Sequence, residues 1–333
     1  STVAGKTFGW AKNADIYVVK LSGLEGSGDS GTGITTSNAF DCIKLWHRNK
    51  PIDSKTGFKR PTIVNMSWGY LTTYNSVSQF TYRGQTHTGA DVSSASQRET
   101  NYGLVNYYSF DYGAYVTNVR IASVDTDVEE LVDEGIHVTI AAGNRRHKID
   151  ISTGVDYNNS AVTNSGTKYY HRGSSPSSPK AVVVGSLDNT SYSTTLDQKA
   201  TYSEAGPGVD IFAHGTYIMA ASSNINQIGG YTYPNISGFK QVAISGTSMA
   251  APQVAGVATL ICQANPGISP ADLKKALTNQ AGSAVRTTSL STDYGENRSI
   301  LGAEQKVLLN KFGSKEQALE VQGSFDIPLT ISF

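Results

Sequence analysis

The sequence lacks the features that mark disulfide-stabilised, membrane-spanning and nucleic-acid-binding proteins. Only 2 of its 333 residues are cysteine, too few for a disulfide framework, so Cys42 and Cys262 are expected to be free, buried thiols in helices. No apolar run approaches the length of a membrane span, and no basic start precedes a hydrophobic stretch at the N-terminus. Lysine plus arginine equals aspartate plus glutamate, at 27 each, which indicates no polyanionic partner. We therefore expect a protein that binds neither a membrane nor nucleic acid.

The chain is also poor in charge, at 16% of residues, whereas glycine (33) and tyrosine (18) are abundant. Such a composition is typical of a loop-rich surface. Apolar runs rich in β-branched residues predict buried strands at 14–21, 62–67 and 136–142, and amphipathic patterns predict helices at 36–47 and 124–133. Strands that alternate with helices predict a three-layer α/β fold with a mostly parallel sheet covered by helices on both faces.

One twelve-residue stretch places a serine at the start of a helix. Residues 245–256 have the sequence Ser-Gly-Thr-Ser-Met-Ala-Ala-Pro-Gln-Val-Ala-Gly, between a predicted short strand at 241–244 and an apolar helix. Gly246 permits a tight turn, and Pro252 falls in the first helical turn, where its missing N–H costs least. Ser248 therefore lies where free N–H groups and the helix dipole favour developing negative charge. A serine in this position is suited to act as a nucleophile.

Other candidate functional residues lie where predicted strands end. In parallel α/β sheets, functional residues collect at the carboxyl ends of the strands. Three segments have this position: Ser67-Trp68-Gly69, Ala142-Gly143-Asn144 and Gly246-Thr247-Ser248.

These segments resemble the motifs of subtilisin-like serine proteases of the proteinase K type. The stretch 245–256 is similar to the nucleophile motif of that family, and Ala141-Ala142-Gly143-Asn144 is similar to its oxyanion motif. Residues 210–216 resemble its Asp-x-x-Ala-Pro-Gly segment, and residues 1–21 resemble the segment that follows the catalytic histidine. The resemblance implies a subtilisin-like peptidase domain over 1–282.

The resemblance implies that the chain hydrolyses peptide bonds through an acyl-enzyme. Ser248 would be the nucleophile, and Asn144 would donate its side-chain N–H to the oxyanion beside the backbone N–H of Ser248. An extended peptide or protein substrate would bind as an added strand. The residues expected to line it are Gly26-Ser27-Gly28, Ser67-Trp68-Gly69, Ala142 and Gly143. Trp68 stands where the family usually has leucine, so it either shapes a subsite or packs in the core.

No cofactor is required for this chemistry, but the resemblance also implies a structural calcium ion. In proteinase K-like enzymes an aspartate and two backbone carbonyls hold the ion, and Asp210, Pro179 and Ala181 have similar places in this sequence. Hard oxygen ligands suit calcium, although a single carboxylate makes a poor site. A plain surface aspartate at position 210 is the alternative.

The catalytic base and its orienting carboxylate do not match any part of this sequence in the expected order. The family's Asp-Ser/Thr-Gly and His-Gly-Thr-His motifs precede the strand that ends at Leu21, so the histidine would fall before residue 1. Asp29-Ser30-Gly31 has matching letters but belongs to the loop that lines the substrate. His214-Gly215-Thr216 also matches, but it follows the oxyanion asparagine. Neither segment is expected to be catalytic.

Several explanations of this gap stay open. A separate N-terminal fragment carrying the Asp and His could complete the fold as a non-covalent partner, or these residues could precede this stretch in the full protein. The chain could also be a silent pseudoprotease with a structural or assembly role, or a peptide-binding module. Loss of the base alone costs about as much as loss of the whole triad, a result known from subtilisin itself, so the chain alone is expected to be almost inert. Retention of Ser248 and Asn144 favours an active parent enzyme, because a scaffold needs neither.

Two further segments fall outside the resemblance. The tyrosine-rich insertion at about 70–118 has little charge, which favours a folded contact surface over disorder. It follows the substrate-lining segment, so it would cover the cleft or bind a partner. An extension occupies 283–333, with a helix or strand predicted at 303–312 and a terminal strand at 321–333. The compartment stays open, with a secreted or particle-associated protein favoured over a membrane protein.

Overall fold

The computed structural model describes most of the chain. The described residues are 1–19, 21, 35–74, 76–88, 94–105, 115–188, 197–222, 231–232, 240–282, 294 and 298–311. The predictions made for Gly26-Ser27-Gly28, Asp29-Ser30-Gly31 and the strand at 321–333 lie outside these residues.

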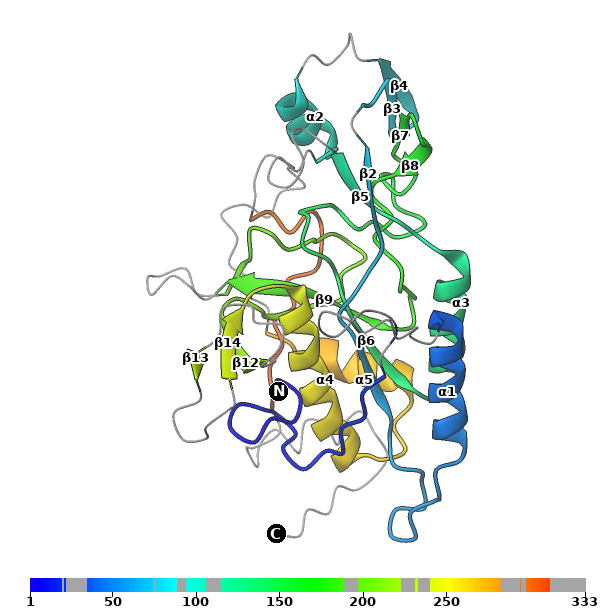
Figure 1. Ribbon diagram of the computed structural model, residues 1–333, viewed down its shortest axis with the longest axis vertical. Helices are drawn as coiled ribbons and strands as arrows, with labels where there is room; N and C mark the ends of the chain where they lie inside the picture. The colour runs from blue at the N-terminus through cyan, green and yellow to red at the C-terminus, as the bar shows by residue number, and fades with distance from the viewer. Residues whose placement is uncertain are drawn as a thin grey trace.

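A parallel sheet forms the centre of the molecule (Figure 1). Its strands lie in the order β1 (Ile63–Met66), β6 (His137–Ala141), β9 (Val182–Asp188) and β11 (Ile211–His214), all parallel. A short strand, β10 (Gln198–Lys199), adds to the end of β9 in the antiparallel direction. The strands predicted at 62–67 and 136–142 are therefore confirmed as β1 and β6.

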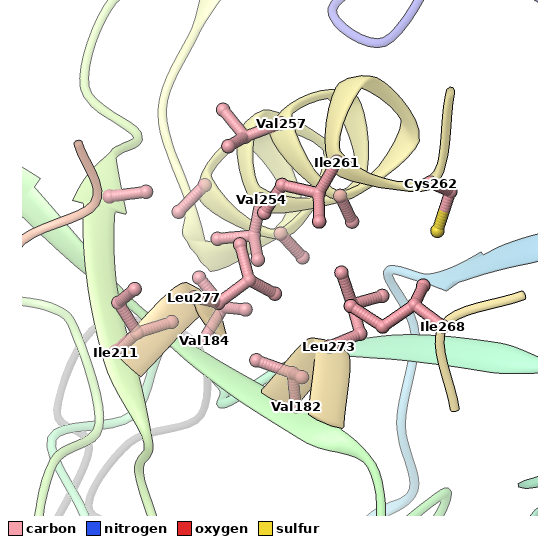
Figure 2. Packing of buried hydrophobic residues seen from close by; sticks show 14 residues of the cluster. Val182, Val184, Ile211, Val254, Val257, Ile261, Cys262, Ile268, Leu273 and Leu277 are labelled. Atoms are coloured by element: carbon pink, nitrogen blue, oxygen red, sulfur yellow. The ribbon is translucent and has the colours of Figure 1, made fainter. Parts of the chain in front are cut away.

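Helices cover both faces of this sheet. On one face, α4 (Thr247–Ala264) and α5 (Pro270–Asn279) pack on β9 and β11 in a cluster that includes Val184, Ile211, Val254 and Leu277 (Figure 2). Much of α4 is alanine and glycine, so its backbone can lie close to the sheet.

On the other face, α1 (Thr36–Arg48) and α3 (Ala122–Asp133) bury Phe40, Val128 and Leu131 against Val138 and Ile140 of β6. Alternate side chains of β6 thus enter opposite layers, as the pleat of a strand requires. The three-layer α/β fold expected from the sequence is observed.

The helix ends follow capping rules that the sequence only partly revealed. Ser269 caps α5 by accepting a hydrogen bond from Asp272 N at 3.1 Å, with Pro270 in the first turn. The cap of α1 is Thr35, which accepts from Asn38 N at 3.2 Å. Ser37 and Asn38 lie close by and have side chains equally suited to that role. Each of the three is a good cap residue, so composition alone does not choose between them.

The buried strand predicted at 14–21 is wrong. The described residues of this run form no strand, and Ile16, Tyr17 and Val18 are 62%, 65% and 88% exposed. A strand requires a neighbour for its backbone N–H and C=O groups. Within the described residues, β1 pairs only with β6, so its other edge has no partner. Among the described residues, neither the apolar run nor the outer edge of β1 thus has a neighbouring strand.

The strand predicted before Ser248 exists but belongs to a separate sheet. β14 (Lys240–Ile244) pairs antiparallel with β12 (Ile218–Ser222) and β13 (Tyr231–Thr232). Its carboxyl end leads through Ser245 and Gly246 directly into α4.

The described residues of the tyrosine-rich insertion form a folded region together with a later segment that the sequence did not reveal. We call this region the tyrosine-rich lobe; it projects from the end of the central sheet (Figure 1). It consists of β2 (Leu71–Tyr74), β3 (Gln79–Tyr82), β4 (Gln85–Thr88), α2 (Ala95–Tyr102), β5 (Tyr115–Asn118), β7 (Ser160–Thr163) and β8 (Gly166–Tyr169). β7 and β8 come from far along the chain and complete the sheet of β3 and β4. Tyr74, Phe80 and Tyr170 are buried in its core.

The segment beyond 282 returns to the body of the protein as far as it is described. Residues 303–311 form neither the predicted helix nor a named strand, but Val307 makes isolated bridges with Phe212 and Gly282. Ile300 and Leu301 are buried in the same cluster as Phe212.

The two cysteines are free, as expected, but only Cys262 is buried. Cys42 is exposed, because it lies on the outer side of α1, so the prediction of burial is wrong for this residue. Among the described residues, no helix is both long enough and apolar enough to cross a membrane.

Candidate active site

Ser248 is the second residue of α4, on a turn held to the end of β11. Gly246 N donates to Gly215 O at 2.8 Å, which joins the turn before α4 to the parallel sheet. A Cβ at Gly215 would lie 2.6 Å from Gly246 O and 2.3 Å from Ser186 Oγ. Only glycine therefore allows this close approach. The backbone N–H of Ser248 donates to no acceptor among the described residues.

Asn144 is fixed through its carbonyl oxygen. Asn144 Oδ1 accepts from Thr247 N at 2.8 Å and from Thr247 Oγ1 at 3.0 Å. Thr247 Oγ1 in turn accepts from Gly143 N at 3.1 Å. Asn144 is exposed, and its Nδ2 has no partner within the described part of the chain. The amide is thus held by its acceptor end, and its donor end is free for a ligand beside Ser248.

Ser67 brings the end of β1 against the same turn. Ser248 Oγ donates to Ser67 O at 3.3 Å, and Ser67 Oγ donates to Ser248 O at 3.0 Å. Ser67 Oγ also accepts from Asn65 Nδ2 at 2.9 Å. Residues from three distant parts of the chain, each at the carboxyl end of a strand, therefore meet at one place.

The other predicted substrate-lining residues are placed differently from one another. Gly69 is exposed, and Gly143 is half-buried. Trp68 packs partly into the cluster beneath α1 and α3 and meets Tyr70 edge-on, with ring centroids 5.6 Å apart. Ala142 is buried, and its N–H donates to Val184 O at 2.9 Å within the sheet. Trp68 thus packs in part against the core, and Ala142 is held within the sheet next to Gly143 and Asn144.

A buried glutamate lies directly behind the Gly143-Asn144 turn. Glu204 N donates to Gly143 O at 3.0 Å, and its carboxylate accepts from Asn118 Nδ2 at 2.7 Å and from the backbone N–H of Arg145. Burial raises the pKa of Glu204 to about 8 against these hydrogen bonds. No local pattern in the sequence indicates this residue, because its burial depends on three separate segments.

No histidine of this chain interacts with Ser248. All six histidines lie within the described residues. Burial lowers the pKa of His137 and His147 to about 4 and that of His171 to about 3, so all three are enclosed and neutral. His214 instead lies with its Nε2 3.2 Å from Asp197 Oδ1. Within the described chain, no histidine therefore stands beside Ser248 and the Asn144 amide.

The three residues predicted to bind calcium do converge, but on a lysine. Lys274 Nζ lies 2.8 Å from Asp210 Oδ1, 2.9 Å from Pro179 O and 2.7 Å from Ala181 O. Within the described residues there is also no group of three or more acidic, histidine or cysteine side chains that could hold a metal ion. The residues present do not fit a metal ion at this place while the ammonium group is there.

Comparisons with known proteins identify the family of the chain. A family model described as the subtilase family, Peptidase_S8, matches residues 1–313. Serine protease AprX of Bacillus subtilis is 34% identical over 46% of this chain and 31% of its own length. Subtilisin-like serine protease pepC of Aspergillus niger is 27% identical over 89% of this chain and 40% of its own length. Cerevisin of Saccharomyces cerevisiae is 26% identical over 83% of this chain and 31% of its own length.

A solved structure gives a weaker match. The crystal structure of a cold adapted subtilisin-like serine proteinase matches 93% of this chain and 71% of its own chain, with 22% identity and a TM-score of 0.46. Of the three curated relatives, by contrast, the chain spans well under half of the length.

Proposed function

The chain belongs to the subtilase family, and from this premise we propose that it is the part of a serine endopeptidase that carries the nucleophile and the oxyanion hole. The observation that carries the proposal is the fixed pairing of the Ser248 turn with Asn144 through Thr247. It leaves two donors, Asn144 Nδ2 and the Ser248 N–H, without an acceptor among the described residues. Two such donors are what a tetrahedral oxyanion requires.

In this function, Ser248 Oγ attacks the carbonyl carbon of the scissile peptide bond. Its proton passes to a histidine supplied from outside this chain, and the amine leaves with that proton. Water then hydrolyses the acyl-enzyme, and the same base assists that step. Throughout, Asn144 Nδ2 and the Ser248 N–H stabilise the negative oxygen. In the structure, Ser248 Oγ donates to Ser67 O instead, a bond of 3.3 Å that is readily exchanged.

The unpaired edge of the central sheet indicates where an added segment that carries the base would bind. One edge of β1 is unpaired among the described residues. The apolar side chains of the run at 16–19 are exposed to solvent. A strand added along β1 would pair with that edge and cover apolar side chains. Its carboxyl end would then lie at the end of β1, beside Ser67 and Ser248. This is where an orienting carboxylate and a base are needed.

An extended peptide is the substrate that suits this site. Ser67, Trp68 and Gly69 directly follow β1; Ser67 contacts Ser248, and Gly69 is exposed. Backbone pairing with such a segment selects unfolded or loop substrates and reads little side-chain identity. The opposite wall predicted from Gly26-Ser27-Gly28 stays a prediction.

A silent pseudoprotease is the second candidate, favoured by the absence of any histidine contact to Ser248. A fluorophosphonate probe separates the two, because it reacts only with an activated serine. The probe is applied to the native material, with any polypeptide that co-purifies, and to Ser248→Ala and Ser245→Ala variants. We expect labelling that is lost in Ser248→Ala and kept in Ser245→Ala, since Ser245 is an exposed serine of the same turn.

A third variant tests the oxyanion donor. Asn144→Asp keeps an oxygen acceptor for Thr247 but removes the donor, so peptide hydrolysis should fall by about 10²–10³ in kcat, the figure known from subtilisin itself. No labelling of the native material, even with the upstream segment supplied, would overturn the endopeptidase assignment.

A further inference from the structure

Three oxygen atoms from separate segments meet at one ammonium group. They are Asp210 Oδ1 just before β11, and the backbone oxygens of Pro179 and Ala181 just before β9. Lys274 reaches them from α5, and all three distances to its Nζ are 2.7–2.9 Å. An ammonium group has three N–H donors, so each donor has one acceptor here.

The phase of α5 sets this contact. Ser269 and Pro270 fix where the helix begins. Leu273 and Leu277 then face the core, and Lys274, next to Leu273, lies along the edge of that face. The side chain of Lys274 is 22% exposed, whereas its neighbour Lys275 is 72% exposed and pairs only within the helix.

The oxygens are arranged for a cation. Burial raises the pKa of Asp210, and the charge of Lys274 opposes that shift. Its second oxygen, Oδ2, accepts from Val183 N at 2.8 Å, which orients Oδ1 toward the two carbonyls. Without a positive charge, a carboxylate and two carbonyl dipoles would repel one another in a partly desolvated place.

We propose that the Lys274 ammonium is the resident cation of this site, in the place where a metal ion would otherwise be bound. The N–O distances of 2.7–2.9 Å are those of charge-assisted hydrogen bonds, and the donor group fills the point on which the oxygens converge. A calcium ion needs six to eight oxygens at about 2.3–2.6 Å and cannot share that point with a second positive charge. The chain thus fastens α5 to the sheet with its own side chain, and this site takes no metal while Lys274 is present.

Thermal unfolding of the purified protein, in the form in which it is isolated, tests this inference. Melting is measured in EDTA and in millimolar Ca²⁺ for the wild type, Lys274→Ala, Lys274→Met and the control Lys275→Ala. In EDTA, Lys274→Ala should lower the Tm by about 5 °C, because it leaves a partly buried carboxylate without its cation. Lys274→Met, which keeps the apolar stem, should show the same loss, and Lys275→Ala should show none.

Calcium is the decisive arm of the experiment. Ca²⁺ should raise the Tm of Lys274→Ala by more than that of the wild type, since only the variant has room for the ion among the three oxygens. This extra gain should vanish in Lys274→Ala/Asp210→Asn, which removes the carboxylate, so a calcium effect from elsewhere in the chain cancels in the comparison. A Tm unchanged by Lys274→Ala, or a loss with no extra gain from Ca²⁺, would overturn the proposal.

Discussion

At the scale of single residues, a sequence motif predicts some of the important side chains of this protein and misses others. Ser248 and Asn144 were predicted because each lies in a short local pattern, Gly-Thr-Ser and Ala-Gly-Asn, at the end of a strand. Glu204 and Lys274 were not, because their roles come from contacts with segments distant in sequence. Burial and pairing of a charged side chain are properties of the folded chain, and a single sequence shows them poorly.

Glu204 gives the clearest pH prediction. Its pKa is about 8 in the folded protein, above the ordinary 4.5, so the folded state binds a proton that the unfolded state has lost between these values. Its contribution to stability therefore falls as the pH rises from about 4.5 to about 8. Glu204→Gln imitates the protonated acid and removes this dependence. We expect the variant to match the wild type at pH 5 and to have the higher Tm at pH 9.

The Tm of Glu204→Gln is compared with that of the wild type at the same pH, because other groups of the protein also titrate. Burial lowers the pKa of Lys199 to about 7, so its contribution rises with pH between about 7 and 10.5. Lys199 is present in both proteins, but its charge interacts with that of Glu204, so the difference in Tm at each pH also includes the loss of this attraction in the variant. Equal pH profiles for the wild type and Glu204→Gln would contradict a buried, protonated Glu204.

At the scale of elements, helices were predicted well and strands less well. The helices α1, α3 and α4 follow from apolar periodicity and caps, which are local. The run at 14–21 has the composition of a strand, yet it forms none in the described residues because strand formation depends on a neighbour. The tyrosine-rich lobe shows the same limit, since β7 joins β3 across a long sequence separation.

A buried charge network joins the lobe to the body. Asp156 accepts from Arg83 Nε of the β3–β4 hairpin at 2.7 Å, from Lys148 Nζ at 2.6 Å and from Tyr294 OH at 3.1 Å. Burial would raise the pKa of Asp156, but the hydrogen bonds from Arg83 and Lys148 lower it overall. One carboxylate therefore holds the hairpin to two distant segments.

Asp156→Asn should destabilise the protein strongly. It leaves Lys148, 7% exposed, without its closest carboxylate, and removal of one partner of a buried pair costs about 3–5 kcal/mol. The free energy of unfolding in urea at pH 7 measures this loss. Because the pKa of Asp156 is lowered, the wild-type advantage is present above the ordinary value of 3.8 and is lost as the pH falls below it.

Asp133→Asn is the matched control. Asp133 pairs with Lys180 at 2.7 Å, but both side chains are on the surface, 61% and 44% exposed. Solvent screens such a pair, so no measurable change is expected. If both variants lost the same free energy, the special role of the buried network would be excluded.

At the scale of the whole molecule, two unsatisfied features are complementary. β1 has an unpaired edge within the described residues, and the run at 16–19 presents apolar side chains to solvent, with Val18 88% exposed. A supplied upstream strand should bind there and bring the base to Ser248. Association and activation would then be one event, since the same strand completes the sheet and the active site.

A pair of exposed valines tests whether that run lies at the junction. Val18→Asp places a carboxylate where the added segment would bury it, at a cost of about 3 kcal/mol, or about a hundredfold in the association constant. Val155→Asp is the matched control, because Val155 is also exposed, at 70%, but lies in the segment that leads to the lobe. It should leave the association constant unchanged. The upstream segment is supplied as a tagged polypeptide, and its binding and the labelling of Ser248 are both measured. If Val18→Asp and Val155→Asp bound the segment and labelled equally, the run at 16–19 would not be part of the junction, and the strand would have to enter elsewhere on the sheet.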